Sequence, residues 1–338
     1  MTLRGLLVRV VATTPAPGLI LRYRSKRRLT VLGYHRIVPA PKKDYPFNEG
    51  VITATPEEFA RELRYLKSNF DVVSISDLLK GLDNPSLLPE RPAVITFDDG
   101  YVDNYTCAFP LLREAGLPGC FFVCTGLIGK SHIPWQEEWV CCLKQSHASR
   151  IDSPFGDGDP PYDLGAANLP ESRKRFRRNV MRLPWSQVPG VLERLRALTR
   201  VNPSDYLHSP LFMTWDAVRQ MAACGMDIGG HTRTHAPLSR VDGDVLGEEV
   251  RGCFDDLNRE LGTPPRAFAY PFGSPDAMSE AADEMIGHAG FAVCFSFVHG
   301  YSPRKRDGRC RLPRIHAVYG DDERAFRLRL ATAPDPSE

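Results

Sequence analysis

Short runs rich in apolar and β-branched residues alternate with amphipathic helical segments along most of this chain. The patterns predict strands at 28–37, 92–99, 119–129, 226–232, 266–273, 292–300 and 310–318. They predict helices at 54–70, 104–118, 171–185, 190–200, 214–225 and 248–262. Strands that alternate with helices favour a parallel sheet, so we expect an α/β fold with its helices outside.

The predicted helix at 54–70 has clear boundary signals. Thr55 is a good N-cap and Glu58 completes a capping box with it. Phe59 and Leu63 then lie on one apolar face of the helix.

Composition narrows the classes of function. The chain has 338 residues, enough for a large core in one or two domains. Its formal net charge is +2, which gives no general electrostatic case for binding nucleic acid. Its nine cysteines form no C-x-x-C pair, so we expect most of them to be reduced and buried.

The first 28 residues carry seven basic side chains and no acidic one. Their apolar runs are too short to span a bilayer, and Arg9 interrupts any signal-peptide core. One interpretation is peripheral contact between residues 1–28 and anionic lipid. The other is a frayed basic leader, because Pro15 and Pro17 interrupt a long helix. We expect a cytoplasmic protein, or one peripheral at the inner membrane.

The stretch "VITFDDGYVDN" places two carboxylates, Asp98 and Asp99, directly after an apolar strand. Adjacent like charges repel, and burial adds to the cost. An ordinary strand end with an Asp-Gly turn is one explanation. However, the carboxyl ends of parallel strands in a barrel meet at one end, and His35, His231 and Tyr270 would lie there too. This coincidence favours a functional site over a turn.

The motif "HTRTH" supplies His231 and His235 at i, i+4 spacing. On a helical turn this spacing places both imidazoles on one side, as in many metal sites. A carboxylate from Asp98 or Asp99 would complete a His/His/Asp set. Three protein ligands with open positions are typical of a catalytic metal ion, whereas a satisfied structural histidine pair is the alternative.

These motifs, in this order, resemble a known family. "TFDDG", then "HTRTH", then "YPFG", with an opening "YHRI" and a "PEEF" helix, resemble the polysaccharide deacetylases. These are carbohydrate esterases of family 4, with a NodB-homology domain. The resemblance implies a distorted (β/α) barrel over residues 28–320, with a variable insertion at about 130–212. A basic leader at 1–27 and a C-terminal tail at 321–338 would flank it.

The resemblance also implies roles for the motif residues. Asp98 would act as the general base. Asp99, His231 and His235 would hold a divalent metal, usually Zn²⁺ and sometimes another transition metal, which would activate the attacking water. The substrate would be an N-acetylated saccharide.

Two further groups of residues are expected near the substrate. A backbone N–H near Tyr270, Pro271 and Phe272 would stabilise the oxyanion of the reacting carbonyl. Trp135 and Trp139 would line the sugar site with aromatic faces, although buried tryptophans commonly belong to the core.

The sequence departs from the family pattern in two places. Many members have an arginine that orients the catalytic aspartate where this chain has Ala269; Arg314 or Arg266 would replace it, and Arg314 is preferred. The general acid is normally a late histidine, for which His316 stands near the expected place. His35 is the rival, and we favour His35.

Three functions remain open on this basis. The first is a metal-dependent N-deacetylase for N-acetylhexosamine units of a cell-surface polysaccharide or its precursor. The second is a deacetylase or deformylase of a lipid-linked or small amino sugar. The third, of another class, is an inactive carbohydrate-binding protein on the same fold.

Overall fold

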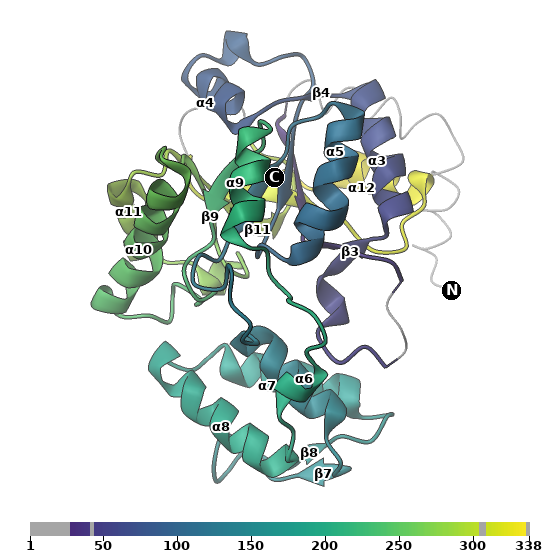
Figure 1. The fold of residues 1–338 in the computed structure, drawn as a ribbon, viewed down its shortest axis with the longest axis vertical. Coiled ribbons are helices and arrows are strands. Elements are labelled where there is room, and N and C mark those ends of the chain that lie inside the picture. The colour runs from purple at the N-terminus through teal and green to yellow at the C-terminus, as the bar shows by residue number, and fades with distance from the viewer. Residues whose placement is uncertain (1–27, 41–43, 304–308, 336–338) are drawn as a thin grey trace.

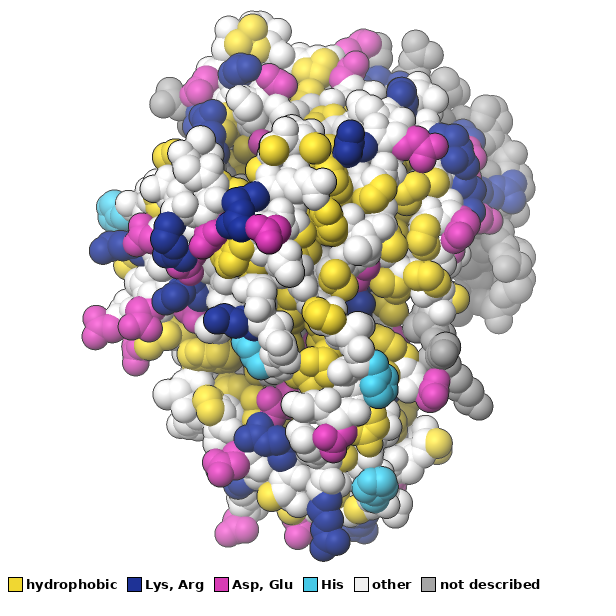
Figure 2. All heavy atoms as spheres, in the orientation of Figure 1, with side chains coloured by type: hydrophobic (Ala, Val, Ile, Leu, Met, Phe, Trp, Pro, Cys, Tyr) yellow, Lys and Arg dark blue, Asp and Glu magenta, His cyan; other side chains and the backbone are white. Residues whose placement is uncertain are grey.

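The computed structural model describes residues 28–40, 44–303 and 309–335 (Figure 1). The predicted basic leader at 1–27, and the membrane contact proposed for it, therefore lie outside the described residues. No helix in the described ranges is long and apolar enough to cross a membrane. On the face shown in Figure 2, basic and acidic side chains are mixed over the outer helices.

Seven parallel strands close into a barrel. Each pairs with the next, and the last pairs back with the first. In spatial order they are β1 (Thr30–Tyr34), β12 (Leu312–His316), β11 (Val293–His299), β10 (Ala267–Ala269), β9 (Asp227–Gly230), β6 (Cys120–Val123) and β5 (Pro92–Phe97). A two-residue strand, β4 (Asp71–Val72), pairs with the start of β5. The prediction of a (β/α) barrel is confirmed.

Helices surround the barrel (Figure 1). They are α3 (Pro56–Asn69), α5 (Phe109–Ala115), α9 (Trp215–Ala223), α10 (Gly243–Leu261), α11 (Glu280–Ala289) and α12 (Glu323–Thr332). The predicted capping box of α3 is present: Thr55 and Glu58 bond reciprocally to each other's backbone N–H. A π-helical turn, η3 (Asn104–Ala108), leads into α5.

Period-2 alternation separates the inside of the barrel from the outside. On β5, Val94 belongs to the interior cluster, whereas Ile95 packs in the cluster beneath the outer helices. Helix α4 (Ile75–Asp83) adds Leu78 and Leu82 to the interior cluster and so closes the end of the barrel where the strands begin. The opposite end, where the strands finish, is left for polar side chains.

The sequence predicts that the barrel domain ends at residue 320, but the packed structure continues beyond it. Helix α12 lies in the predicted C-terminal tail, yet Phe326 and Leu330 are buried in the main core cluster. Tyr301 also donates a hydrogen bond to the carbonyl of Leu330 at 2.6 Å. The chain beyond 320 therefore completes the outer layer.

The chain between β6 and α9 forms a lobe at the carboxyl end of the barrel, drawn below it in Figure 1. Its elements are α6 (Trp135–Gln145), β7 (Arg150–Ile151), β8 (Tyr162–Asp163), α7 (Leu169–Val180), η4 (Trp185–Gln187), α8 (Val188–Thr199) and η5 (Pro203–Tyr206). This segment corresponds to the predicted insertion. Residues of α6, α7 and α8 share one hydrophobic cluster with Tyr101 and Leu127 of the barrel loops.

The remaining elements are short. They are β2 (Arg36–Ile37), η1 (Glu49–Val51), β3 (Ile52–Ala54), η2 (Pro85–Leu87) and η6 (Pro275–Ala277). Strands β2 and β3 pair in parallel and lie beside His35, which separates β1 from β2.

Candidate active site

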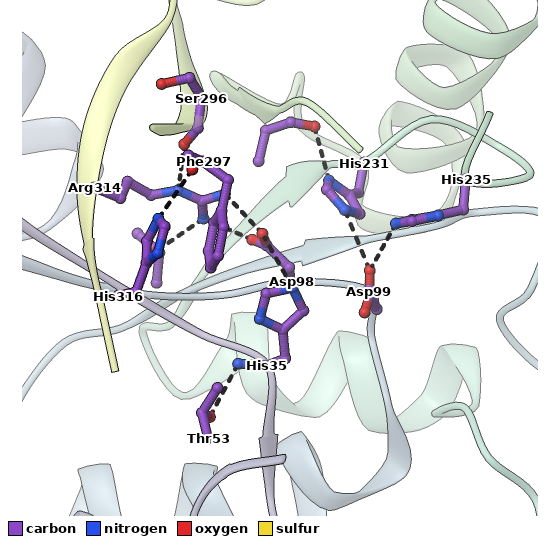
Figure 3. A network of polar contacts seen from close by, with 12 residues as sticks. His35, Thr53, Asp98, Asp99, His231, His235, Ser296, Phe297, Arg314 and His316 are labelled. Atoms are coloured by element: carbon purple, nitrogen blue, oxygen red, sulfur yellow. Dashed lines mark hydrogen bonds and ion pairs between the residues drawn. The ribbon is translucent and has the colours of Figure 1, made fainter. Parts of the chain in front are cut away.

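Asp99, His231 and His235 meet at the carboxyl end of the barrel (Figure 3). Asp99 follows β5 and His231 follows β9. The Nε2 atoms of His231 and His235 lie 3.2 and 3.1 Å from Oδ1 of Asp99. All three side chains are buried. Three predicted metal ligands thus converge on one point.

The prediction that a helical turn brings the two histidines together is wrong. Residues 231–237 form no helix. Instead, Thr232 and His235 adopt left-handed backbone conformations, with φ of 64° and 62°. The N–H of His235 donates to Oγ1 of Thr232 at 3.0 Å. This tight loop turns the imidazole of His235 back towards Asp99.

Left-handed backbone is concentrated at this site. Six described residues other than glycine have positive φ, and four of them lie here: Asp99, Thr232, His235 and Phe272. Such a conformation costs about 1–3 kcal/mol for a residue with a Cβ, and persists only where its surroundings hold it. The site is therefore built from backbone that the fold constrains.

The residues fit a divalent metal ion. Nδ1 of His231 lies 2.7 Å from the carbonyl oxygen of Ala269, which only accepts, so Nδ1 carries the proton. A neutral His231 then directs its Nε2 lone pair at Oδ1 of Asp99. The lone pairs of these two atoms face each other, and they repel unless a proton or a cation lies between them. Two imidazoles and one carboxylate form a donor set that transition metals such as Zn²⁺ favour.

Opposing effects set the charge of the ligands. Burial alone would raise the pKa of Asp99, but the two histidines that face it hold this pKa well below its usual value. Burial would lower the pKa of His231, yet the Asp98 and Asp99 carboxylates raise it overall. Asp99 therefore stays ionised and attracts positive charge.

Asp98 is held by Arg314, which comes from β12, on the other side of β1 from β5. Its Oδ1 and Oδ2 accept hydrogen bonds from Nη1 and Nη2 of Arg314, both at 2.7 Å. Arg314 is fully buried, and it also donates to the carbonyl of Ser296 and to Oγ1 of Thr96. Burial would raise the pKa of Asp98, but the Arg314 charge keeps it below its ordinary value.

A glycine on the intervening strand makes room for the ring of Phe297 next to this pair. A Cβ added at Gly33 of β1 would lie 2.8 Å from the Phe297 ring and 3.6 Å from Cβ of Arg314.

Of the two arginines considered from the sequence, the structure places Arg314 against Asp98. Arg266 is exposed at the beginning of β10.

His35 lies beside Asp98, with its Nε2 4.0 Å from Oδ2 of Asp98. Its N–H donates to Oγ1 of Thr53 at 3.2 Å, and its carbonyl accepts from Nδ2 of Asn104 at 2.7 Å. Burial lowers the pKa of His35 although Asp99 and Asp98 act in the opposite direction. The sequence analysis missed Thr53 and Asn104 as supports of His35, although Asn104 belongs to the same stretch as Asp98.

His316 lies on the far side of Phe297. The two rings stack with centroids 3.9 Å apart, and His316 Nε2 lies 2.9 Å from the Phe297 carbonyl oxygen. The ring of His35 contacts the same phenylalanine edge-on at 4.9 Å. Burial, with added repulsion from His299 and Arg314, lowers the pKa of His316 to about 4. His316 is thus a neutral ring packed against Phe297.

The "YPF" segment offers one free backbone donor. Tyr270 uses its N–H for the carbonyl of Phe295, and its hydroxyl turns away to Asp283 at 2.6 Å. Pro271 has no N–H. Among the described backbone hydrogen bonds, none uses the N–H of Phe272. The ring of Phe272 packs 4.8 Å from that of His235, so this residue borders the ligand cluster.

Cys124 is a buried neighbour that the sequence analysis missed. Its Sγ lies close to Asp99 and His231, and it donates a hydrogen bond to the carbonyl of His231 at 3.2 Å. Burial raises the pKa of the thiol well above its usual value, so it stays protonated. The hydrogen bond to its carbonyl makes Cys124 a support for the backbone of His231.

Both predicted tryptophans line a cavity of about 460 Å³ next to these residues. Nε1 of Trp135 donates to the carbonyl of His235 at 3.3 Å, and its ring lies 5.7 Å from that of Phe272. Trp139 stacks on Phe176 within the lobe at 5.1 Å. The tryptophans therefore serve the hydrophobic cluster of the lobe and also face the cavity.

A sequence profile of the polysaccharide deacetylases matches residues 87–291, which is over half of the chain. The chain belongs to the polysaccharide deacetylase family, the class that the barrel and its residues already suggested. It is also similar to YxkH of Bacillus subtilis (strain 168), with 28% identity over 112 residues. That match covers 33% of this chain and only 37% of YxkH.

Two solved structures share the fold. The Streptococcus pyogenes deacetylase PplD, in complex with acetate, gives a TM-score of 0.59 at 17% identity, over 88% of this chain and 96% of PplD. IcaB from Ammonifex degensii gives 0.56 at 20% identity, over 91% of this chain and 98% of IcaB. At this level of identity the likeness establishes the barrel fold.

Proposed function

We propose that this chain is a metal-dependent hydrolase that removes N-acetyl groups from N-acetylhexosamine units of a cell-surface polysaccharide or its precursor. The observation that carries the proposal is the different surroundings of two neighbouring carboxylates. Asp99 faces two imidazoles, whereas Asp98 is gripped by Arg314. A ligand and a base are what hydrolysis of an acetamide requires.

The metal would be held by Asp99, His231 and His235. When bound, it would supply Lewis-acid polarisation and an acidified water. The tautomer of His231, fixed by the carbonyl of Ala269, suits this role because it leaves Nε2 free to bind.

Asp98 is the group placed to take the proton of the attacking water. Its two hydrogen bonds to Arg314 fix the carboxylate plane and keep it ionised. A carboxylate with a lowered pKa is a weak base, but its fixed position within reach of the ligand cluster compensates through proximity. The attacking oxygen bonds to the carbonyl carbon as Asp98 receives the proton.

Phe272 would stabilise the developing oxyanion through its backbone N–H. A donor held rigidly in the left-handed region needs no reorganisation when charge develops on the carbonyl oxygen. The positioning of this N–H depends on the packing of the Phe272 ring against His235 and Trp135.

His35 would protonate the leaving amine. The C–N bond breaks as the nitrogen takes a proton, and without a donor this step would stall. His35 is neutral at rest because burial lowers its pKa, so it would first need a proton. Its Nε2 lies 4.0 Å from Asp98, which has just received one. The proton would thus pass from the base to the leaving group through His35.

Acetate release tests this function. Purified protein is incubated with N-acetylated oligosaccharides of several sugars, before and after treatment with a chelator. We expect release from at least one substrate, loss on chelation, and recovery on adding Zn²⁺ or another divalent transition metal. Asp98→Asn provides the inactive control. Release that persists after full removal of metal would reject the proposed mechanism, and release from no substrate would favour a carbohydrate-binding role.

A further inference from the structure

The cavity beside the candidate active site extends into the lobe between α6 and α7, and we call it the α6–α7 pocket. At one end it reaches His35, Phe272 and Phe297 of the barrel. Within the lobe it is lined by Trp135, Gln136 and Trp139 of α6 and by Arg173, Lys174 and Arg177 of α7. The pocket is therefore continuous with the place where an acetamide would react.

The charge of the lining has one sign. Three basic residues of α7 line the pocket, and no acidic residue does. Arg173 is paired with Glu49 at 2.6 Å. Lys174 lies 3.7 Å from Glu171, and both of these side chains are mostly exposed, which makes the pair weak. Positive charge thus remains available along this wall.

Arg177 is the basic residue nearest the reacting centre. Its guanidinium carbon lies 5.9 Å from the centroid of the Phe272 ring, which itself packs on His235. Among the described residues Arg177 forms no ion pair, although, besides a Ser274 hydrogen bond and the Arg240 charge, its own charge helps to lower the pKa of Asp276. One aromatic ring therefore separates this cation from a predicted metal ligand.

Gln136 is an independent sign that the pocket takes a polar ligand. It lies on α6, between the two tryptophans in sequence, and is only 8% exposed. Neither its Oε1 nor its Nε2 has a hydrogen-bond partner among the described residues. Buried polar atoms left without partners are costly, and a bound ligand that pairs with them removes that cost.

The two tryptophans give the pocket its aromatic wall. Trp135 is tied to the ligand loop through the carbonyl of His235, so its ring is fixed relative to the reacting centre. Trp139 lies one helical turn further along α6. Sugar rings pack their C–H faces on such surfaces, and Gln136, which lines the same pocket, would meet sugar hydroxyls.

We propose that the α6–α7 pocket binds the part of the substrate next to the reacting N-acetyl sugar, and that this part carries an oxyanion, a phosphate or a carboxylate. Arg177 binds the oxyanion, with Lys174 beside it, and Gln136 pairs with a polar group of the adjoining unit. This assignment rests on the proposed function, because it takes the acetamide to lie at Asp99, His231 and His235. A neutral saccharide would leave the basic side chains of α7 that line the pocket without an anionic partner.

Three probes with the same reacting sugar test the proposal. They are N,N′-diacetylchitobiose, its 1-phosphate, and a disaccharide in which N-acetylglucosamine is linked to glucuronic acid. We expect kcat/KM for one charged probe to exceed that for the neutral one by about 10- to 100-fold, as a hydrogen-bonded charge provides. The better charged probe identifies the oxyanion as phosphate or carboxylate. Equal values for all three would overturn the proposal.

Variants of α7 provide a matched comparison. Arg177→Gln should raise KM for the preferred charged probe by about tenfold and leave the neutral probe unchanged. Arg178→Gln removes the same charge from the next residue of the helix, which is exposed and does not line the pocket. It should alter neither value. A similar effect of both variants would mean a general field effect and would reject a specific site.

Gln136→Leu separates binding from structure. If Gln136 awaits a ligand, leucine removes two unpaired polar atoms, so the melting temperature should rise while KM for the charged probe also rises. A purely structural glutamine would lower the melting temperature on substitution, and that result would remove Gln136 from the site.

Binding to the Asp98→Asn variant, measured by calorimetry, distinguishes failure of this inference from failure of the proposed function. Tighter binding of a charged probe that is lost in Asp98→Asn/Arg177→Gln supports the pocket even if no acetate is released by the wild type. In that case the deacetylase function fails and the pocket assignment stands. The inference is overturned if the affinity measured by calorimetry depends neither on the charge of the probe nor on Arg177. This holds whether or not the wild type releases acetate.

Discussion

Arg314 and Asp98 form a bidentate ion pair inside the barrel although 216 residues separate them in the chain. Arg314 comes from β12, and Asp98 follows β5; β1 lies between these strands. Both side chains point inward because of the strand period of two. The two hydrogen bonds fix the plane of the Asp98 carboxylate, whereas the neighbouring Asp99 faces the imidazoles of His231 and His235.

Arg314→Lys should lower kcat/KM by about 100-fold, because lysine keeps a charge but cannot grip both carboxylate oxygens. Arg314→Ala should go further. Burial would then raise the pKa of Asp98 with only the two neighbouring histidines opposing it, so the acid limb of the pH profile of kcat/KM should move to higher pH. It should also destabilise the fold by about 3–5 kcal/mol, which is why the lysine variant is needed. Arg266→Ala, an exposed arginine, is the control. An unmoved acid limb in Arg314→Ala would contradict this role.

Substitution of Asp98 and of Asp99 should have different effects on the amount of bound metal. Asp98→Asn should keep its metal and lose nearly all turnover, because a base is lost and a ligand is not. Asp99→Asn, His231→Ala and His235→Ala should each lose bound metal, measured by elemental analysis after dialysis against a weak chelator. Equal metal occupancy in wild type and the histidine variants would remove the predicted site. Near-normal turnover by Asp98→Asn would assign the base elsewhere.

A buried carboxyl group outside the site should govern the pH dependence of stability. Glu62 of α3 is buried, and Tyr34 donates a hydrogen bond to its Oε2 at 2.7 Å. Burial raises its pKa to about 8. A folded pKa above the unfolded one means that the folded state holds the proton more tightly. This stability is fully present below about pH 4.3, the unfolded value, and is lost as the pH rises through about 8.

Glu62→Gln should remove that dependence, because the amide oxygen still accepts from Tyr34 and carries no proton to lose. We expect the melting temperature of wild type to fall between pH 5 and pH 9 more steeply than that of Glu62→Gln, as measured by thermal unfolding at each pH. Glu57→Gln, on the exposed side of the same helix, should track the wild type. Parallel curves for wild type and Glu62→Gln would show that Glu62 is ionised in the fold.

Alternation of strands and helices was enough to predict a parallel α/β fold with outer helices, and the resemblance of the motifs to a known family added the barrel. His35, Asp98, Asp99 and His231 were placed at one end by the rule for parallel strands alone. The same rule could not show that the two carboxylates have different partners. Those contacts depend on which strands are neighbours and on side-chain direction.

The local structure of "HTRTH" shows where periodicity misleads. An i, i+4 pair predicts a helical turn, whereas a loop with two left-handed residues produces the convergence. Non-glycine residues rarely adopt that backbone, and only the packed surroundings select it. A pattern of residue types contains no such information.

Helix α6 was not predicted for a related reason. Its buried face combines Trp135 and Trp139 with buried Gln136 and Glu137, so the sequence lacks a clean division into apolar and polar faces. Gln136 is buried where the helix borders the pocket, and Glu137 is buried because Tyr101 and the N–H of Asn48 donate hydrogen bonds to it. A helix cannot be predicted from its pattern of apolar and polar residues where its buried face also carries polar side chains.

The identity of the general acid is the sharpest remaining question about the site. His35 lies 4.0 Å from Asp98, whereas His316 is stacked behind Phe297 and bound to that residue's carbonyl. His35→Ala should therefore lower turnover by about 10²–10⁴-fold, the range expected for a lost general acid, with metal content unchanged.

His316→Ala should cause a smaller loss. Its effect would pass through Phe297, which both histidines contact and which lines the α6–α7 pocket. Because the pKa of His316 is lowered to about 4, this ring is neutral near pH 7 and is a poor proton donor there. His316→Gln, which keeps a side-chain hydrogen-bonding group, should recover part of the loss if the role is packing and positioning. A deeper loss in His316→Ala than in His35→Ala, at equal metal content, would transfer the acid to β12 and leave His35 a structural role.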